Sequence, residues 1–261
     1  GDEEDGGRPL AVSRAALVEA AKGAKYAIGF ENGDSKIEHA VSARRGIQNW
    51  ELRVTAKTGH SSQVFTPEAG DGAIFTAAKI LAAFRDQLGH EPHLTFNPGV
   101  IGGGTTADLD AATASVKAAG KTNVISAQTV VTGDMRALTM EQFAKTRATM
   151  ERIVAAANTA TSTATITFGE GYPPLAPAPG NDALLAAYNK ASEDLNLGTV
   201  TAVSPDRAGA ADVSFIGGLV PSVIDAVGLK GGDDHSPAEF ATLRTLAIQT
   251  KRAAVTILRL K

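Results

Sequence analysis

The stretch NWELRVTA, residues 49–56, decides the fold of the region around it, because its apolar and polar residues alternate. The apolar positions are Trp50, Leu52, Val54 and Ala56. A period of two places one face of a strand in a core and leaves the other face in water. The stretch therefore predicts a half-buried strand, of the kind found in antiparallel sheets and not in parallel sheets covered on both faces.

Further helix and strand patterns follow this strand along the chain. Apolar residues recur at helical spacing at Ile74, Ala77, Leu81, Phe84 and Leu88. Strands are predicted over residues 93–101, 122–138 and 162–171, and a second helix over residues 139–158, with Phe143, Met150, Ile153 and Val154 buried. The small-residue stretch between the first two of these strands predicts an irregular loop. The order from residue 49 to 169 is therefore β-α-β-β-α-β, the split-βαβ or ferredoxin-like arrangement.

The sequence on either side of this unit has a different, α/β texture. On the N-terminal side, residues 13–26 predict a helix capped by Ser13, and YAIGFE (26–31) predicts a buried parallel strand. On the C-terminal side, a Pro-rich stretch is followed by helical patterns, a short strand within residues 220–228 and a long final helix. That helix is predicted to begin at HSPAEF, where Ser236 and Glu239 form a capping box. We therefore expect an α/β domain, residues 1–48 and 170–261, interrupted by a smaller α+β domain, residues 49–169.

The composition limits the class of protein. The 261 residues are 43% hydrophobic and 20% charged, with a net charge of −3, which is ordinary for a globular protein and offers no basic field to nucleic acid. The chain contains no apolar run near 18 residues, so we expect no membrane span and a soluble protein of the cytoplasm or periplasm. The absence of cysteine leaves histidine and carboxylates as the side chains that could hold a metal.

Several polar residues stand where they could carry chemistry. His235 directly precedes the predicted cap of the last helix, and Glu31 ends a predicted strand at the edge where α/β sheets bind ligands. Glu3 and Glu4 are adjacent in GDEEDG, so one can bind a metal while the other accepts a proton from metal-bound water. Each of these residues alone is also consistent with an ordinary surface position.

The inserted unit supplies a second group of candidates. His60 and Ser61 lie in GHSSQ, which resembles the start of a nucleophile elbow but has Gln63 where the motif has glycine. Asn123 and Arg136 lie at the two ends of the predicted strand 122–138. Both side chains are suited to gripping a carboxylate or an oxyanion, which arginine can do through two parallel hydrogen bonds.

Taken in order, the segments DEE, YAIGFE, GHSS, NVIS…GDMR, GAAD and DDHSPAEF resemble the di-zinc metallopeptidases. These include glutamate carboxypeptidase, aminoacylase, acetylornithine deacetylase and succinyl-diaminopimelate desuccinylase. The resemblance is greatest to the glutamate carboxypeptidase branch, and it runs from residue 1 to the final helix. It implies a zinc-exopeptidase-type catalytic domain with an inserted lid that also forms the dimer interface.

The resemblance also implies a role for each candidate residue. Glu3 is expected to be the general base and His60 the lid histidine that stabilises the oxyanion in the partner subunit's site. The expected zinc ligands are Glu4, Glu31 and His235. Asn123 and Arg136 are expected to contact the substrate carboxylate or oxyanion. Two zinc ions about 3.5–4 Å apart would lower the pKa of a bridging water and clamp the tetrahedral intermediate.

The chain departs from the family pattern in two respects. The family's His-x-Asp ligand motif and its bridging aspartate are not found before the DEE segment, so three of five expected ligands are present. We therefore expect a chain that is incomplete at its N-terminus, with weak zinc binding and little activity alone. Tyr172 stands where the glutamate carboxypeptidase branch has a basic residue, which argues against recognition of a terminal glutamate.

The leading hypothesis is a zinc-dependent exopeptidase or amidohydrolase that cleaves a peptide or N-acyl amide bond beside a free carboxylate. Its expected partners are a small peptide or N-acyl amino acid as substrate and a second copy of the chain through the lid, with no nucleic acid and no membrane. A second hypothesis is a non-catalytic module that dimerises through residues 49–169. A third is a serine-type esterase with Ser61 as the nucleophile.

Overall fold

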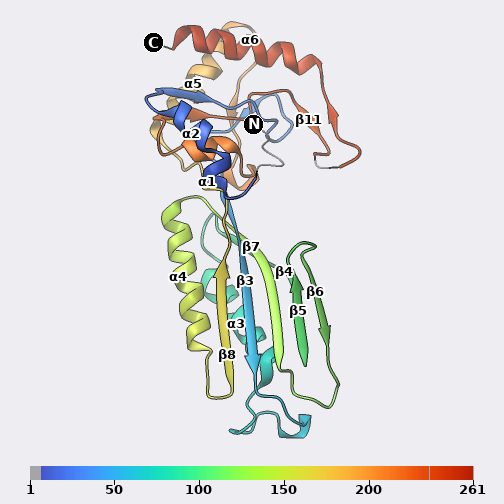
Figure 1. Cartoon of the computed structure of the whole chain (residues 1–261). Helices are drawn as coiled ribbons and strands as arrows, with labels where there is room; N and C mark the ends of the chain where they lie inside the picture. Colours follow the sequence, from blue (N-terminus) through green and yellow to red (C-terminus); the bar gives the residue numbers. More distant parts are fainter. Residues whose placement is uncertain (1–6, 235, 261) are drawn as a thin grey trace. The chain divides into compact units, whose positions relative to one another are not determined.

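The computed structural model describes residues 7–234 and 236–260, and the chain forms two compact units (Figure 1). Unit 1 comprises residues 1–46, 138–140 and 172–261, and unit 2 comprises residues 47–137 and 141–171. Each unit has its own hydrophobic core. The predicted mixed α/β class with an inserted α+β unit is confirmed.

Unit 2 is built on a four-stranded sheet with the strand order β4-β7-β3-β8. The strands are β3 (Gly46–Ala56), β4 (Thr95–Gly104), β7 (Gln128–Ala137) and β8 (Ser162–Phe168). The helices are α3 (Gly72–Leu88) and α4 (Met140–Ala156), with the short η1 (Ser61–Gln63) between β3 and α3. The antiparallel pairings of β3 with β8 and of β4 with β7 agree with the predicted β-α-β-β-α-β arrangement.

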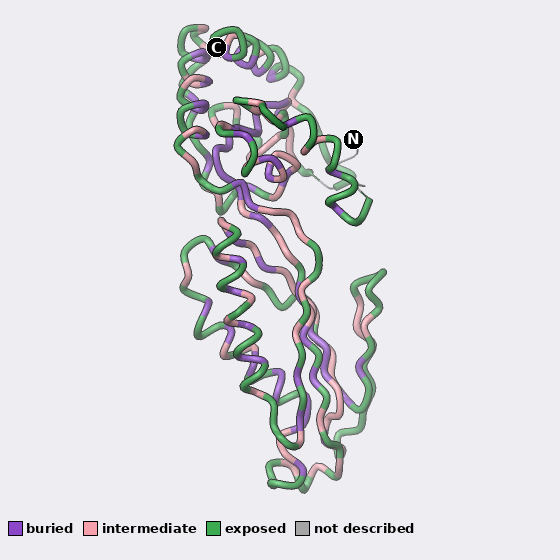
Figure 2. The backbone as a smooth tube through the Cα atoms, turned by 60° about the vertical axis from the view of Figure 1, so that its left-hand side comes forward, coloured by how far each residue is buried: buried purple, intermediate pink, exposed green. Residues whose placement is uncertain are grey.

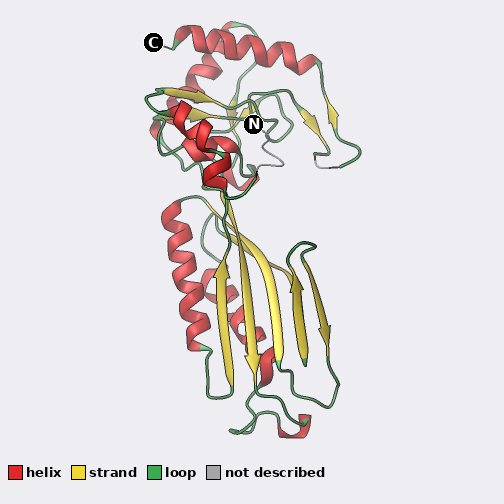
Figure 3. Ribbon diagram, viewed as in Figure 1, coloured by secondary structure: helices red, strands yellow, loops and turns green. Residues whose placement is uncertain are grey.

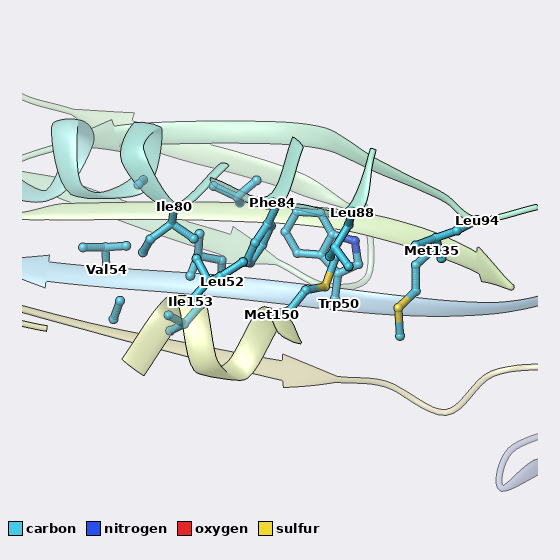
Figure 4. Close-up of a cluster of buried hydrophobic side chains, with 14 of the residues drawn as sticks. Trp50, Leu52, Val54, Ile80, Phe84, Leu88, Leu94, Met135, Met150 and Ile153 are labelled. Carbon is cyan, nitrogen blue, oxygen red and sulfur yellow. The ribbon is translucent and has the colours of Figure 1, made fainter. Parts of the chain in front are cut away.

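The core of unit 2 lies between this sheet and its two helices (Figure 4). Trp50, Leu52 and Val54 of β3 are at most 2% exposed, as their alternation predicts. The indole ring of Trp50 packs edge-on against Phe84 of α3, with ring centroids 6.1 Å apart. Figure 2 shows buried and exposed residues alternating along the strands and helices. Only Ile74 of the predicted helix face disagrees, since it is 45% exposed.

The loop expected between the second and third strands is instead a β-hairpin, formed by β5 (Thr106–Asp110) and β6 (Ser115–Ala119). The Asp110 carboxylate accepts hydrogen bonds from the N–H groups of Ala112 and Thr113, which closes the turn. The hairpin packs on the sheet because β4 offers glycine there: a Cβ on Gly102 would come within 2.4 Å of Val116 of β6. Small residues therefore mark a close backbone approach in this stretch and not a loop.

Unit 1 contains a short parallel pair, β1 (Tyr26–Ile28) and β10 (Ser222–Ile224), which confirms a parallel strand at YAI (Figure 3). Its main helices are α5 (Pro179–Asp194) and α6 (Arg244–Arg259). The smaller elements are α1 (Leu10–Ser13), α2 (Ala15–Ala21), β2 (His39–Ala40), β9 (Thr201–Ala202), η2 (Pro205–Arg207), η3 (Asp212–Ile216), β11 (Gly231–Gly232) and β12 (Phe240–Ala241). Of the helices that the structure describes, none has both the length and the apolarity to cross a membrane.

Two predicted helix starts in unit 1 are wrong. Ser13 ends α1 and its hydroxyl donates to the carbonyl of Leu10, so it caps no following helix. Ser236 accepts a hydrogen bond from the N–H of Ala238, but this turn does not continue as a helix. Phe240 pairs with Gly232 across the β11–β12 hairpin, and α6 therefore begins only at Arg244.

Candidate functional site

The structure describes four of the seven predicted site residues. Glu31 lies in unit 1, and His60, Asn123 and Arg136 lie in unit 2. Glu3, Glu4 and His235 lie outside the described residues, so the roles expected of them stay predictions. The geometry of each unit is considered separately below.

Glu31 follows β1 at the carboxyl end of the parallel pair, where its side chain is exposed. Its backbone N–H approaches the carboxylate of Asp225 at 3.4 Å, and its carbonyl accepts a hydrogen bond from Gly228. Asp225 directly follows β10, so the carboxyl ends of both parallel strands meet at one edge. Ligands of α/β sheets bind at such an edge. The strand before Glu31 is not fully buried, however, because Tyr26 is 38% exposed.

A buried ion pair holds this edge together. The carboxylate of Asp225 is fully buried and lies 2.8 Å from the guanidinium of Arg44, whose side chain is 5% exposed. Arg44 also donates to the carbonyl of Gly209, and the other carboxylate oxygen of Asp225 accepts from the N–H of Ala226 at 2.7 Å. A buried ion pair is costly unless its groups make further hydrogen bonds, and here both groups do.

Asn32 and Lys230 connect the Glu31 segment to the loop after β10. The Nζ of Lys230 donates to the backbone carbonyls of Asn32 and Ala226, and the residue is 2% exposed. Burial lowers the pKa of Lys230 from 10.5 to about 8. The Asn32 amide donates to the carboxylate of Asp234 at 3.2 Å. The loop that leads to His235 in the sequence therefore lies beside the Glu31 segment.

A second polar pair lies three residues beyond Glu31. The side chain of Asp34 is 5% exposed and contacts the Nδ1 of His39 at 2.7 Å, with Arg207 at 3.5 Å. Burial alone would raise the pKa of Asp34, but the hydrogen bond and charge of His39, the backbone N–H of Lys36 and the charge of Arg207 together hold it below its usual value. The carboxylate therefore stays ionised and fixes the imidazole ring.

His60 and Asn123 are brought together in unit 2. An isolated antiparallel bridge joins His60 to Val124, and the N–H of Ser61 donates to the carbonyl of Asn123 at 2.9 Å. Both side chains are exposed. The predicted strand around Asn123 starts later than expected, at Gln128. The two residues therefore share one exposed end of the sheet.

The hydrogen bonds of His60 define its tautomer. Its Nδ1 accepts from the backbone N–H of Ser62 at 3.3 Å and lies 2.8 Å from the Ser62 hydroxyl. A nitrogen that accepts a backbone N–H carries no proton, so the proton of the neutral ring is on Nε2. Nε2–H is thus a donor, as an oxyanion-binding histidine requires.

Arg136 lies near the C-terminal end of β7, whereas Asn123 precedes the start of this strand. Eight residue steps of β7 separate Gln128 from Arg136, which is roughly 26 Å at the usual rise of a strand. The guanidinium of Arg136 contacts Asp134 at 3.2 Å on the sheet face turned away from the helices. Asp134 also lines a cavity of about 500 Å³ under the tip of the β5–β6 hairpin.

Ser61 is not arranged as a nucleophile. Its neighbouring strand, β3, is antiparallel to β8, whereas a nucleophile elbow joins a parallel strand directly to a helix. The imidazole of His60 contacts Ser62 and not Ser61. The structure therefore gives the esterase hypothesis no support.

The donor types of the predicted zinc ligands, carboxylate and imidazole, suit zinc. In residues 7–234 and 236–260, however, no group of three or more histidines and carboxylates is placed to hold a metal ion. Two of the three predicted zinc ligands, Glu4 and His235, lie outside the described residues, so the predicted zinc site stays a prediction.

Sequence reasoning missed three residues that shape this region, namely Arg44, Asp225 and Lys230. Asp225 and Lys230 lie in the segments around the second parallel strand, but a single acid or lysine in a loop gives no sign of burial. Their importance depends on contacts between positions about 180 residues apart, such as Arg44 with Asp225. Tyr172, where a basic residue was expected, accepts a hydrogen bond from buried Arg14 at 2.5 Å.

Comparison with known proteins places this geometry in context. Residues 42–162 match the peptidase dimerisation domain, M20_dimer. No curated protein sequence matches the chain. Among solved structures, the chain is similar to the aminopeptidase PepT from Bacillus cereus ATCC 10987, with a TM-score of 0.72 and 22% identity over 98% of this chain and 61% of that one.

Two further solved structures are similar. A tripeptidase from Staphylococcus aureus subsp. aureus Mu50 has a TM-score of 0.71 and 19% identity, with 98% of this chain and 61% of that chain covered. An amidase of the hydantoinase/carbamoylase family from Burkholderia phymatum has a TM-score of 0.59 and 17% identity, over 90% and 54% of the two chains. The chain thus spans about 61% of the length of the first two.

The resemblance to the metallopeptidase family is confirmed by the domain match together with the shared fold. The glutamate carboxypeptidase branch stays a prediction, because none of these comparisons selects it. The chain therefore carries a peptidase dimerisation domain at residues 42–162, and 98% of it shares the fold of the solved aminopeptidase and tripeptidase.

Proposed function

We propose that the protein that carries this sequence is a zinc-dependent exopeptidase or amidohydrolase. It cleaves a peptide or N-acyl amide bond beside a free carboxylate. The observation that carries the proposal is the peptidase dimerisation domain at residues 42–162, inserted in a chain of which 98% has the fold of an aminopeptidase and a tripeptidase. Residues 1–48 and 170–261 are the proposed catalytic domain, and residues 49–169 the lid.

Glu31, the one proposed zinc ligand that the structure describes, lies at the carboxyl edge of β1 and β10. Glu4, Glu31 and His235 are the proposed zinc ligands, and Glu3 the proposed general base. Zinc, when bound, supplies a water of lowered pKa and positive charge for the developing oxyanion. Support for a shared site comes from Asn32, whose amide contacts Asp234, the residue before His235.

The proposed lid residues act from two ends of one sheet. His60 offers Nε2–H as an oxyanion donor, and Asn123 lies beside it as a second polar group. Arg136 is too far from both to touch the same small substrate, since roughly 26 Å of strand separates the two ends. A site that uses all three residues therefore needs two copies of the chain, each contributing one end of its lid. This supports a homodimer.

The edge of β4 is the surface best suited to this dimer. No strand in the described part of the chain is hydrogen-bonded to the outer edge of β4, and a free edge pairs readily with a second copy. Four large apolar side chains of unit 2 are 45–62% exposed, and we call them the edge patch: Ile101 of β4, Ile74, which lies against Gly103 of β4, and Phe65 and Phe75. The rings of Phe65 and Phe75 are in contact at 5.3 Å. A two-fold axis at this edge would cover the same patch on both copies.

Zinc content and turnover test the proposal together. The protein is assayed on tripeptides and N-acyl amino acids with and without zinc, while bound metal is measured by mass spectrometry. We expect chelation to abolish turnover, Glu31→Ala to reduce bound zinc, and Glu3→Gln to abolish turnover while zinc stays bound. Glu38→Gln, an exposed acid nearby in the sequence, serves as the control. Hydrolysis that resists chelation and survives Glu3→Gln would overturn the proposal.

A non-catalytic assembly role remains the second candidate, because the matched domain is the dimerisation domain of peptidases and not a catalytic one. It predicts a dimer that is insensitive to chelator and shows no turnover on any amide tested. Sedimentation measured beside the hydrolysis assay separates the two candidates.

A further inference from the structure

The loop that carries His60 is held on both sides by the segment that contains Asn123. The N–H of Ile125 donates to the carbonyl of Gly59 at 2.9 Å, and the N–H of Ser61 donates to the carbonyl of Asn123 at 2.9 Å. These two bonds fix the backbone before and after His60. The imidazole ring can therefore change its direction only by rotation about its own side-chain bonds.

The short helix η1 brings Ser62 onto this ring. The N–H of Gln63 donates to the carbonyl of His60 at 3.0 Å, which closes the turn. Within the turn, the backbone nitrogen of Ser62 lies 3.3 Å from the Nδ1 of His60, and its hydroxyl oxygen lies 2.8 Å from the same atom. His60 is thus the N-cap of η1, a position that serine, threonine, aspartate and asparagine usually occupy. The ring offers one acceptor nitrogen there, so both donors of Ser62 meet it.

The two contacts of Ser62 have different effects on the ring. The backbone N–H can only donate, so it makes Nδ1 the acceptor, and the hydroxyl, which can donate or accept, then donates as well. The hydroxyl contact is the stronger one, because 2.8 Å is a usual length for an O–H donor whereas 3.3 Å is long for an N–H donor. A flip of the ring would exchange Nδ1 for a C–H group and lose both bonds. Ser62 therefore fixes the tautomer and the orientation together.

This control of the ring matters for the proposed role of His60. An exposed imidazole without a fixed partner can carry its proton on either nitrogen. A ring with its proton on Nδ1 would turn the lone pair of Nε2 outward, and a lone pair repels an oxyanion instead of binding it. The donor that the proposed reaction requires therefore depends on a partner that keeps Nδ1 unprotonated.

We propose that Ser62 is the positioning residue of His60: its hydroxyl and its backbone N–H hold Nδ1 as an acceptor, so that Nε2–H is presented to the oxyanion. This role rests on the proposed hydrolase function, in which His60 binds the oxyanion. Ser62 touches no reacting atom and acts through the imidazole alone. The effect of its hydroxyl on turnover should therefore disappear when His60 is removed.

A double-mutant cycle in the hydrolysis assay tests this dependence. We expect Ser62→Ala to lower kcat about tenfold with little change in KM, because it removes one hydrogen bond behind a donor that acts in the transition state. His60→Ala should lower kcat about a hundredfold or more, and Ser62→Ala should then have almost no further effect. Ser62→Thr, which keeps the hydroxyl, should retain turnover. Ser204→Ala, at an exposed serine that caps η2, is the control. An equal loss from Ser62→Ala with and without His60 would overturn the proposal.

The ring nitrogens of His60 supply a second test, which needs no turnover. Nitrogen NMR of protein labelled with ¹⁵N-histidine distinguishes protonated from unprotonated ring nitrogens, and the signals lost in His60→Ala identify this residue. In the neutral ring we expect the proton on Nε2, an Nδ1 signal that shifts in Ser62→Ala, and an Nδ1 signal that is retained in Ser62→Thr. A proton on Nδ1, or an Nδ1 signal unaffected by Ser62→Ala, would contradict the inference. The expected signals in a protein that hydrolyses no amide would support the hold of Ser62 on the ring and overturn the proposed function alone.

Discussion

Glu31 owes its position to backbone contacts that a neighbouring carboxylate makes possible. Its N–H approaches Asp225, which is itself fixed by Arg44, and the close passage of β1 beside Asp225 requires glycine at position 29. A Cβ on Gly29 would lie 2.2 Å from the Asp225 carboxylate and 2.6 Å from Val213. The edge that carries Glu31 therefore depends on glycine at position 29 as well as on the ion pair of Arg44 and Asp225.

Gly29→Ala should consequently destabilise unit 1, by about 1–3 kcal/mol as is usual for overpacking. Urea unfolding followed by circular dichroism measures the change. Gly218→Ala is the matched control, because no atom lies within 4 Å of the Cβ that it would add. Equal free energies of unfolding for the two variants would show that the passage at Gly29 is not tight.

Lys230 should make the free energy of unfolding depend on pH. With a pKa of about 8 when folded and 10.5 when unfolded, the folded protein loses this proton first as the pH rises. The unfolded state then binds more protons, so this residue makes the free energy of unfolding rise between pH 8 and pH 10.5. Relative to Lys230→Met, the wild-type protein should gain on the order of 1–3 kcal/mol over this range. A constant difference between the two proteins would refute the shift.

At the scale of elements, the sequence pattern predicts best where burial is one-sided. The alternation in β3 and the helical spacing in α4 indicate which side chains face the core. The structure confirms both elements. The capping box at Ser236 is a local signal, and there the pairing of Gly232 with Phe240 prevails over it. Pairing partners are set by the fold and not by nearby residues, so such outcomes cannot be read from a short stretch.

The helix α3 shows how a single element serves two surfaces. Phe84 is fully buried against Trp50, whereas Phe75 on the same helix is 51% exposed in the edge patch. Phe84→Ala should reduce the free energy of unfolding by about 3–5 kcal/mol, through lost contacts and the cavity left behind. Chemical denaturation at low protein concentration measures this cost.

Phe75→Ala is the companion variant and should leave that free energy almost unchanged. Because the edge patch is the proposed dimer interface, Phe75→Ala should instead weaken dimerisation, as measured by sedimentation. A Phe75→Ala protein that dimerises like wild type would place the interface elsewhere.

At the scale of the whole molecule, the order of elements predicted the fold, but the site could be predicted only in part. An order of strands and helices survives sequence divergence because it depends on pattern alone. The joining of Asn123 to His60, and the separation of Arg136 from both, depends on which ends of β3 and β7 meet. The positions of these residues depend on which strands pair, and the pairing joins strands that are distant in the sequence. Asn123 and Arg136, which belong to one predicted strand, therefore lie at opposite ends of the sheet.

The separation of His60 from Arg136 supplies the most direct test of a dimeric hydrolase with shared sites. His60→Ala and Arg136→Ala are prepared separately, mixed in equal amounts, dissociated and allowed to reassociate before the hydrolysis assay. Each mixed dimer contains one site with both residues intact, so random pairing should restore about a quarter of wild-type turnover from two nearly inactive proteins. Activity that stays at the level of the separate variants after mixing would contradict the account, because it would mean that one chain supplies both residues to the same site.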